Sequence, residues 1–301
     1  MKVLVVGGTG FIGRRLVPLL AGRGAEVVAM DIAPEAADFG DMAETRKGDV
    51  TQFDQVMALV AEVKPDRLVN LAYFIGELPP RIALKLDILG MGNCFEAARL
   101  GGVAHTVYAS SLAVSGQQSH FGERAAHEDD HRYGDNQYAM HKIFNEWQAE
   151  DYSTKYGMAI TGIRPANVTG PDKIYGSIDH VRCVTFPARG EPVSFPHADA
   201  MRAPIHVDDV AEAFARVTLA EAPQHRIYNT GGHAISMGDL AALVREFLPD
   251  ADISFEQETG GLAASGNFLI ENRRLVEEFG LQYTPFRDRV LQIIEAVQAE
   301  V

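Results

Sequence analysis

Apolar residues along the chain fall into short runs that alternate with longer stretches of helical spacing. The first run, Val3-Leu4-Val5-Val6, stops at a glycine cluster. Further runs of the strand type lie at 25–31, 44–47, 67–72, 103–110 and 158–163, and helical patterns at 11–20, 52–63, 82–100 and 136–156 separate them. This alternation predicts an α/β fold: a doubly wound parallel sheet with helices on both faces.

The glycine cluster after the first strand has the spacing of a dinucleotide-binding turn. Gly8, Gly10 and Gly13 form Gly-x-Gly-x-x-Gly, and Gly7, Gly10 and Gly13 also lie three residues apart. Such glycines allow a tight turn, a close approach to a pyrophosphate and close packing of the next helix on the strand. The helix N-terminus then supplies unpaired N–H groups to the phosphates. We therefore predict a nucleotide site here.

An acidic residue at the end of the second strand indicates which nucleotide. Asp31 follows Gly13 by 18 residues, close to the offset of ~20 at which a carboxylate binds an adenosine ribose. A carboxylate at that place repels a 2′-phosphate, so the sequence favours NAD over NADP.

The pattern loosens beyond Arg164-Pro165. Proline, glycine and histidine are scattered over 171–204, and Ile205-His206-Val207 then leads into a helix whose cap we expect to be a carboxylate of Asp208-Asp209. A last strand is expected at 226–229, with a mainly helical tail from Ser236 onward. We predict a nucleotide-binding domain over 1–168, to which 205–230 return, and a smaller substrate lobe made of 169–204 and 231–301.

Composition narrows the classes of partner. The chain has 301 residues, 47% of them hydrophobic, and a formal net charge of −14. That charge argues against a nucleic-acid or anionic-membrane partner but not against a small anionic substrate. The N-terminal apolar run is too short for a signal peptide and no stretch approaches a membrane span, so a cytoplasmic protein is expected. Cys94 and Cys183 are expected to be buried small hydrophobes.

The sharpest chemical pattern is Tyr138-Ala139-Met140-His141-Lys142. Positions i and i+4 share one face of a helix, so Tyr138 and Lys142 point the same way. An ammonium beside a phenol favours the phenolate and brings it into the range of a useful base. Ser110-Ser111, in the run YASSLAVSG, end the fifth strand, where ligands bind in open α/β sheets. Together these residues predict proton transfer to or from a substrate hydroxyl.

With the glycine motif and the serine strand in this order, the chain resembles the extended short-chain dehydrogenase/reductase family, in its NAD-dependent epimerase/dehydratase group. The resemblance covers roughly 1–211. It is carried by GGTGFIG, Asp31, Gly48-Asp49-Val50, Asn70-Leu71-Ala72, Gly90-x-x-Asn93, YASSLAVSG, YAMHK, Arg164-Pro165-Ala166-Asn167-Val168-x-Gly170-Pro171 and His206-Val207-Asp208-Asp209-Val210.

The resemblance implies a Rossmann fold, NAD as the cofactor and a role for each matching residue. Tyr138 is the implied general acid/base, Lys142 binds the nicotinamide ribose and lowers the pKa of Tyr138, and Ser111 orients the substrate alcohol. The cofactor-binding residues implied are Gly7, Gly10, Phe11, Ile12, Gly13, Asp31, Ile32, Asp49, Val50, Leu71, Ala72, Tyr73, Tyr138, Lys142, Pro165 and Ala166. The substrate-binding residues expected are Ser111, Ser115, Asn167 and Arg202.

Departures from the family pattern narrow the reaction. Leu112-Ala113 stand where dehydratases carry an Asp-Glu pair, which argues against dehydration. Asp87 stands where an asparagine is usual. Of the segment with which sugar-nucleotide enzymes bind a diphosphate, only Arg202 is kept, so a nucleotide-diphosphate substrate is in doubt.

We therefore expect an NAD-dependent dehydrogenase that acts on a secondary alcohol of a sugar, sugar acid or related polyol. An epimerase that oxidises transiently and reduces the other face is the alternative, and a non-catalytic NAD sensor is a third possibility that the retained Tyr138 and Lys142 disfavour. His127-x-x-x-His131 lies in a polar stretch and is expected to be solvated surface, with no metal. The family resemblance also implies a homodimer through the helix that carries Phe144 and Trp147.

Overall fold

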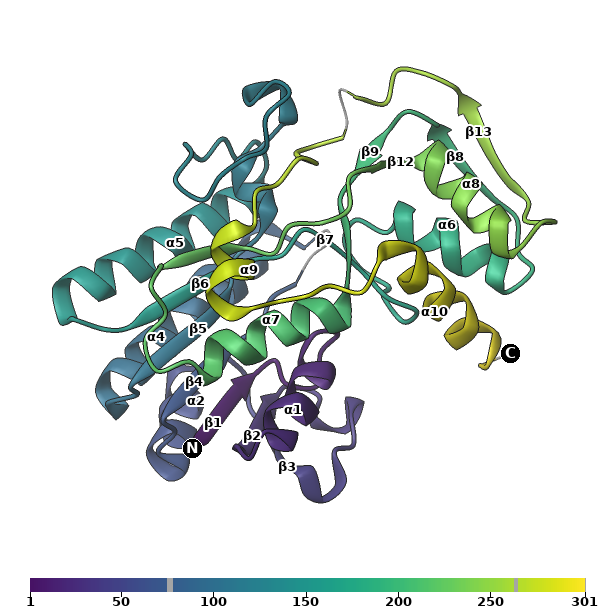
Figure 1. Ribbon diagram of the computed structural model, residues 1–301. Helices are drawn as coiled ribbons and strands as arrows, with labels where there is room; N and C mark the ends of the chain where they lie inside the picture. Colours follow the sequence, from purple (N-terminus) through teal and green to yellow (C-terminus); the bar gives the residue numbers. More distant parts are fainter. Residues whose placement is uncertain (75–77, 263–264, 301) are drawn as a thin grey trace.

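The structure is a computed structural model that describes residues 1–74, 78–262 and 265–300, and a seven-stranded parallel sheet is its centre (Figure 1). The strand order is β11-β6-β5-β4-β1-β2-β3. The strands are β1 Lys2–Val6, β2 Glu26–Asp31, β3 Ala43–Lys47, β4 Arg67–Asn70, β5 His105–Ala109, β6 Ile160–Arg164 and β11 Ile227–Asn229. Chain order reverses at β1 and β4, so a crevice is expected at the carboxyl ends of these two strands.

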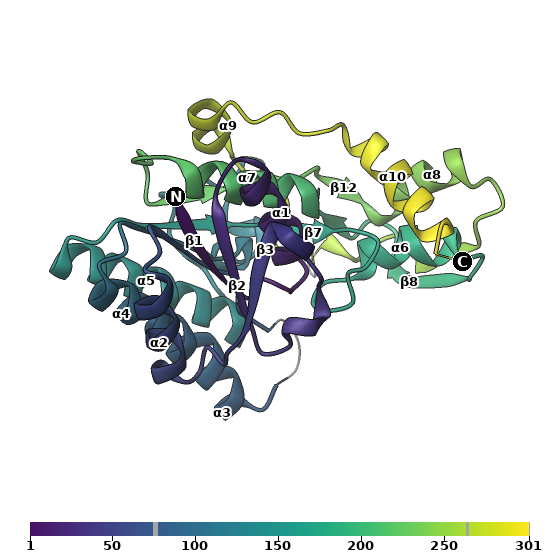
Figure 2. The same cartoon turned by 90° about the horizontal axis from the view of Figure 1, so that it is seen from below.

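The sheet is buried on both faces, as the apolar runs predict. In β1, Val3 and Val5 belong to one core cluster, and Leu4 and Val6 to another. Figure 2 shows the two helical layers on opposite sides of the sheet. One layer holds α1 Gly13–Gly22, α7 Val207–Leu219 and α9 Arg273–Phe279, and the other holds α2 Phe53–Val63, α4 Gly90–Gly101 and α5 Gln137–Tyr156. The doubly wound parallel sheet is thereby confirmed.

A second, smaller core lies beside the sheet (Figures 1 and 2). It is built from α6 Asp179–Ala188, β8 Val193–His197, α8 Met237–Phe247, β13 Ile253–Gln257 and α10 Phe286–Gln298. Two short strand pairs adjoin it: β7 Asn167–Thr169 with β10 Pro204–His206, and β9 Met201–Arg202 with β12 Ile235–Ser236. The residue boundaries of the two predicted lobes stay a prediction.

The chain beyond Ser236 is mainly helical, as expected, but it also contains the strand β13, which the sequence analysis does not predict. This strand runs parallel to β8, with Ile253 opposite Val193 and Phe255 opposite Phe195. Its apolar residues alternate, and the rings of Phe195 and Phe255 lie 6.0 Å apart between centroids. The period-2 pattern is only five residues long, so the helical segments around it mask it in the sequence.

The helix predicted over 82–100 has an irregular first half. It comprises α3 Pro80–Ala83, a π-helical segment η3 Leu84–Leu89, and α4. Short 3₁₀ turns lie at η1 Pro34–Ala36, η2 Gly40–Met42, η4 Leu112–Ser115 and η5 Gln118–His120. The described residues contain no helix that is both long and apolar enough to cross a membrane. Cys94 and Cys183 are unpaired and fully buried, as expected.

The cap of α7 differs from the sequence expectation. His206, and not a carboxylate, caps the helix: its Nδ1 accepts the backbone N–H of Asp208 at 3.2 Å. Asp208 and Asp209 instead bind Arg289 of α10, with 2.5 Å between Asp209 Oδ1 and Arg289 Nη2. A guanidinium is a stronger partner for a carboxylate than a backbone amide, so Arg289 takes both acids.

Candidate active site

The glycine loop between β1 and α1 has the shape that its spacing predicts. Gly7 has a φ of 79°, and a Cβ there would lie 2.6 Å from the Ala72 nitrogen. A Cβ on Gly13 would lie 2.4 Å from the Gly7 oxygen, so any side chain would push α1 off the turn. Gly10 has only the Gly7 oxygen nearby, at 3.3 Å, which leaves its other side open. This open side leaves the backbone at Gly10 accessible beside the N-terminus of α1, where a diphosphate would bind.

Asp31 is fixed at the end of β2 by the same loop. Its Oδ2 accepts the Thr9 N–H at 3.2 Å, and its Oδ1 accepts the Ala33 N–H at 3.3 Å. Ile32 beside it is 65% exposed. The carboxylate is thus held next to the open side of the glycine turn, which fits the predicted role on an adenosine ribose.

The other predicted cofactor residues follow the carboxyl ends of neighbouring strands. Asp49 and Val50 come after β3, and Leu71, Ala72 and Tyr73 after β4. Pro165 and Ala166 follow β6, and the Pro165 carbonyl accepts the N–H of Leu112, beside Ser111. Phe11 and Ile12 lie at the start of α1, and the Phe11 ring is the nearest group to a Cβ built on Gly170, at 3.0 Å. Because all these strands are parallel, their ends share one edge of the sheet with the glycine loop. Val50 is buried.

Ser111 and Tyr138 meet at this edge. Ser111 follows β5, and its Oγ accepts the Ala113 N–H at 3.1 Å at the start of η4. Tyr138 lies in the first turn of α5, which Asn136 caps by accepting the Ala139 N–H at 3.0 Å. Burial raises the pKa of Tyr138 to about 12, although the Ser111 hydroxyl lowers it. The hydroxyls of both residues are thus neighbours at the place where a substrate alcohol is expected.

Lys142 lies one helical turn below Tyr138 and is only 1% exposed. Its Nζ donates to the Ala109 carbonyl at 2.6 Å and lies 3.3 Å from the centre of the Tyr73 ring. Tyr73 in turn meets Tyr138 edge to face, with 5.3 Å between ring centroids. Burial lowers the pKa of Lys142 to about 7, against the opposing effect of the Asp87 and Glu146 charges.

This arrangement modifies the electrostatics expected from the sequence. Nζ of Lys142 is 5.8 Å from the centre of the Tyr138 ring and lies closer to the Tyr73 ring, at 3.3 Å from its centre. Burial therefore dominates at Tyr138, and its pKa is raised where the sequence pattern predicts a lowered one. The oxidised nicotinamide ring of NAD would supply positive charge that favours the phenolate of Tyr138.

Two of the four predicted substrate-binding residues, Asn167 and Arg202, form hydrogen bonds or ion pairs within the protein. Asn167 accepts the Ala203 N–H at 2.8 Å and holds β7 against the chain before β10. Arg202 binds Asp179 at 2.9 Å and the Met201 carbonyl at 2.8 Å. Its Nε has no hydrogen-bond partner among the described residues, so this guanidinium keeps a free donor. Ser115 is buried in η4.

Sequence reasoning missed two buried charge clusters behind Ser111, Tyr138 and Lys142. Glu146 receives two bonds from Arg164, at 2.7 and 2.8 Å, one from the Ser110 hydroxyl at 2.6 Å, and an ion pair from Arg132 at 2.6 Å. Asp87 accepts from the His141 ring at 3.0 Å. The partners are far apart in sequence, and no spacing rule joins them. Only the unusual acid at position 87 gave a signal.

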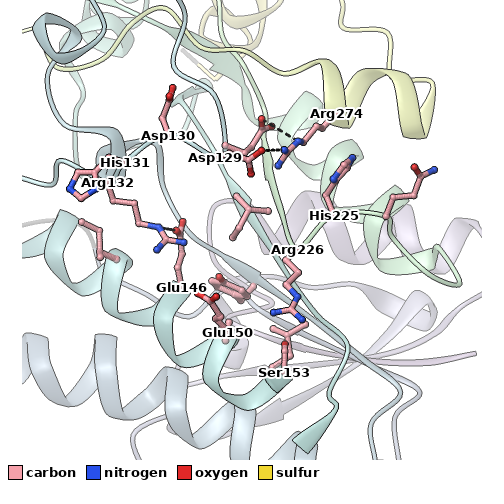
Figure 3. Close-up of a pocket in the computed structure, with 17 residues that line it drawn as sticks. Asp129, Asp130, His131, Arg132, Glu146, Glu150, Ser153, His225, Arg226 and Arg274 are labelled. Atoms are coloured by element: carbon pink, nitrogen blue, oxygen red, sulfur yellow. Dashed lines mark hydrogen bonds and ion pairs between the residues drawn. The ribbon is translucent and has the colours of Figure 1, made fainter. Parts of the chain in front are cut away.

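A cavity of about 730 Å³ lies on the outer side of the Glu146 cluster (Figure 3). Figure 3 shows Arg132 paired with Glu146 and Arg274 paired with Asp129 in its wall. Acidic and basic side chains are both present, and Ser111, Tyr138 and Lys142 are not among its lining residues. It is therefore separate from the candidate active site. His127 and His131 belong to no group of three or more potential metal ligands in the described part of the chain.

Comparison with known proteins identifies the family of the chain. The model of the NAD dependent epimerase/dehydratase family matches residues 3–231. A UDP-glucose 4-epimerase of Mycolicibacterium smegmatis is 31% identical over 234 residues, which cover 72% of each chain. The structure of Thermus thermophilus UDP-glucose 4-epimerase in complex with NAD superimposes with a TM-score of 0.87 at 24% identity over the whole of both chains. A GalE-like L-threonine dehydrogenase from Cupriavidus necator gives 0.83 at 21% identity, covering 100% of this chain and 99% of the other.

The chain belongs to the NAD-dependent epimerase/dehydratase family of extended short-chain dehydrogenases/reductases. It is an enzyme, and its cofactor is NAD.

Proposed function

We propose that this enzyme is an NAD-dependent dehydrogenase that oxidises a secondary alcohol of a sugar, sugar acid or related polyol. One observation carries the proposal: the Tyr138 and Ser111 hydroxyls adjoin each other at the sheet edge that also bears the glycine loop, with Lys142 one turn along the same helix. This is the set of groups that alcohol oxidation needs: a hydroxyl to orient the substrate, a base, and a cation beside the cofactor.

The roles of the residues follow from their positions. Ser111 orients the substrate hydroxyl, and Tyr138 accepts its proton as the carbon–oxygen double bond forms. Lys142 would hold the nicotinamide ribose, and Asp31 would hold the adenosine ribose. NAD would supply C4 of its nicotinamide as the acceptor of the hydride from the alcohol carbon. The products are a ketone, NADH and a protonated Tyr138, which returns its proton to solvent.

The free donor of Arg202 favours a substrate that carries a negatively charged group. Its side chain is 14% exposed and its Nε is without a hydrogen-bond partner in the described structure. An acid group would meet this donor at the cost of weakening the Asp179 pair. A uronate dehydrogenase of Pseudomonas syringae is 30% identical over 163 residues, which cover 54% of this chain and 58% of that protein. Such a dehydrogenase acts on a sugar acid, and a similar substrate suits the proposed site.

Epimerisation is the second candidate, because the relatives that cover about three quarters of the chain include UDP-glucose 4-epimerases. An epimerase oxidises its substrate transiently and reduces it again on the other face, so it accumulates no NADH.

One experiment separates the two functions. The purified protein is incubated with NAD and a panel of free sugars, sugar acids and sugar nucleotides, and both NADH absorbance and product stereochemistry are followed. A dehydrogenase accumulates NADH, whereas an epimerase inverts one carbon without a net signal. Tyr138→Phe is the control: it should bind NAD as the wild type does and lose activity. Turnover retained in that variant would contradict the mechanism for both functions.

We also propose a homodimer. The outer face of α4 and α5, with the adjoining end of η3, bears large apolar side chains that are 42–59% exposed: Leu89, Leu100, Met140, Phe144 and Trp147. α4 and α5 lie side by side in both views (Figures 1 and 2). A second copy of this face would cover these side chains in a four-helix arrangement. A cytoplasmic location stays a prediction from the sequence.

A further inference from the structure

A buried acid–imidazole pair lies directly behind the catalytic residues. Asp87 is 3% exposed and His141 is 7% exposed, and 3.0 Å separate Asp87 Oδ2 from His141 Nδ1. His141 immediately precedes Lys142 on α5. Asp87 lies in the π-helical segment η3, a distortion that is frequent at functional sites. Burial raises the pKa of Asp87, while the hydrogen bond from His141 and the charge of Lys142 act in the opposite direction and favour the carboxylate.

The Asp87 charge reaches each of the groups around the catalytic hydroxyl. It favours the ammonium form of Lys142 and raises the pKa values of both Tyr73 and Tyr138. The Tyr73 side chain also lies beside the Asp87 carboxylate. Tyr73 contacts both the Lys142 ammonium group and the Tyr138 ring, as described above, so one carboxylate influences all three groups.

The other carboxylate near Lys142 does not share this role. Glu146 is held by two guanidinium groups, Arg164 and Arg132, and by the Ser110 hydroxyl. Its charge is thus more than balanced by its own partners. The charged and titratable groups that face Lys142 are therefore Asp87 and His141, the balanced Glu146 cluster, and the two tyrosines. Asp87 is the carboxylate among them without a cationic guanidinium partner.

We propose that Asp87, held in place by His141, is a positioning residue that serves as the counter-charge of Lys142 and favours the ammonium form of the lysine over Tyr73. The proposal rests on the proposed function for its effect on catalysis, but not for its effect on the lysine. His141 supplies the hydrogen bond that aims the carboxylate, and the π-helical turn brings the acid inward.

Direct titration of Lys142 tests the counter-charge. Lysines are labelled with ¹³C at Cε, and NMR follows their protonation with pH; loss of one signal in Lys142→Met assigns it. Asp87→Asn keeps an acceptor for His141 and removes the charge, and we expect it to lower the Lys142 pKa by about one unit. Asp151→Asn is the matched control, because Asp151 lies on the same helix in an exposed pair with Lys155. It should leave the Lys142 signal unchanged.

His141 variants test how the carboxylate is held. His141→Gln retains a hydrogen-bond donor for Asp87, so Lys142 should titrate in this variant as it does in the wild type. His141→Leu removes the donor and should shift Lys142 as Asp87→Asn does. If Lys142 titrates identically in folded wild-type and Asp87→Asn protein, the proposal is wrong. Thermal unfolding of each variant shows whether it is folded, and His141→Gln remains informative should His141→Leu not fold.

The pH profile of NAD reduction gives a readout that a merely structural role would not move. Removing the Asp87 charge lowers the pKa of both Lys142 and Tyr138, so both limbs of the Asp87→Asn profile should move to lower pH by about one unit. If Asp87 had only a structural role, Asp87→Asn would lower kcat at every pH and leave both limbs of the pH profile in place. That result would overturn the proposal. If the wild type turns over no substrate, the proposed function fails while the NMR titration still decides this inference.

Discussion

Lys142 shows at the scale of a single residue how function conflicts with stability. Burial lowers its pKa from 10.5 to about 7. Below pH 7 the lysine is charged in both the folded and the unfolded chain, and its burial cost is fully present. Between pH 7 and 10.5 only the unfolded lysine is charged, so unfolding takes up a proton and the folded state gains stability as pH rises.

Lys142→Met exposes this cost. Measured without NAD, the free energy of unfolding of the wild type should rise relative to that of Lys142→Met between pH 7 and 10, by on the order of 3 kcal/mol. Urea unfolding at a series of pH values measures the difference. A difference that does not change with pH would mean that Lys142 keeps its ordinary pKa in the folded chain.

We expect Asp31 to determine the preference of the enzyme for NAD over NADP. Asp31→Asn keeps an acceptor for the Thr9 or Ala33 N–H and removes the charge that repels a 2′-phosphate. We expect the affinity for NADP relative to NAD to rise by about tenfold, since a charge contact at a protein surface is worth a few kcal/mol at most. Calorimetric titration with both cofactors checks this, with the exposed Asp41→Asn as control. An unchanged ratio would show that another residue makes the selection.

Individual residues were predictable from sequence where the role depends on local spacing. Gly7, Gly13 and Asp31 lie in one βαβ unit, and their conformations follow from the turn itself. The charge of Lys142 was not predictable, because it depends on Asp87 in η3 and on Tyr73 after β4, and both are distant from Lys142 in the sequence. Arg202 has its expected place, but sequence could not show that Asp179 binds it.

At the scale of elements, α5 is held by its inner face as well as by its cap. Glu146 is completely buried as a side chain and binds Arg164 of β6, which is 1% exposed. The ion pair ties the helix to the sheet behind Ser110. Since removing one partner leaves the other charge buried and unpaired, the pair matters more for integrity than for net stabilisation.

Glu146→Ala should therefore lower the free energy of unfolding by about 3–5 kcal/mol. Asp151→Ala, which breaks the exposed Lys155 pair on the same helix, should cost about 0.5 kcal/mol or less. Chemical denaturation of both variants gives the comparison. Equal losses would mean that Arg164 finds another partner when Glu146 is removed.

Whole elements were predictable where their periodicity is long. The seven sheet strands and α5 follow from runs bounded by glycine, proline or a cap. β13 was not predictable, because five alternating residues carry little signal. The His206 cap was not predictable either, because Asp208 and Asp209 bind Arg289, which lies 80 positions beyond Asp209 in the chain. The π-helical distortion at 84–89 leaves no signature in the hydrophobic periodicity of the sequence.

At the scale of the whole molecule, the apolar face of α4 and α5 sets the proposed assembly. Phe144 and Trp147 lie 5.5 Å apart between ring centroids and remain exposed. Burying such aromatic residues drives most stable association.

Trp147→Lys combined with Phe144→Lys should convert the dimer to a monomer and leave the fold intact, because neither side chain belongs to a core cluster. Sedimentation velocity at several concentrations measures the mass. Met42→Lys, an exposed apolar position near β3, is the control and should not change it. A wild-type protein that is monomeric at every concentration would contradict the proposed dimer.

The route of the chain through the large sheet has a consequence for how the protein is made. Val210, Phe214 and Tyr228 complete the core on the α1 side of the sheet, yet they follow the residues of α6 and β8 in the chain. While the ribosome synthesises the intervening segment, Val3, Val5 and Val107 have no α7 to cover them. This apolar face of the nascent chain is therefore open to aggregation until residue 229 emerges from the ribosome. Only then can β11, the last edge strand, join the nucleotide-binding sheet.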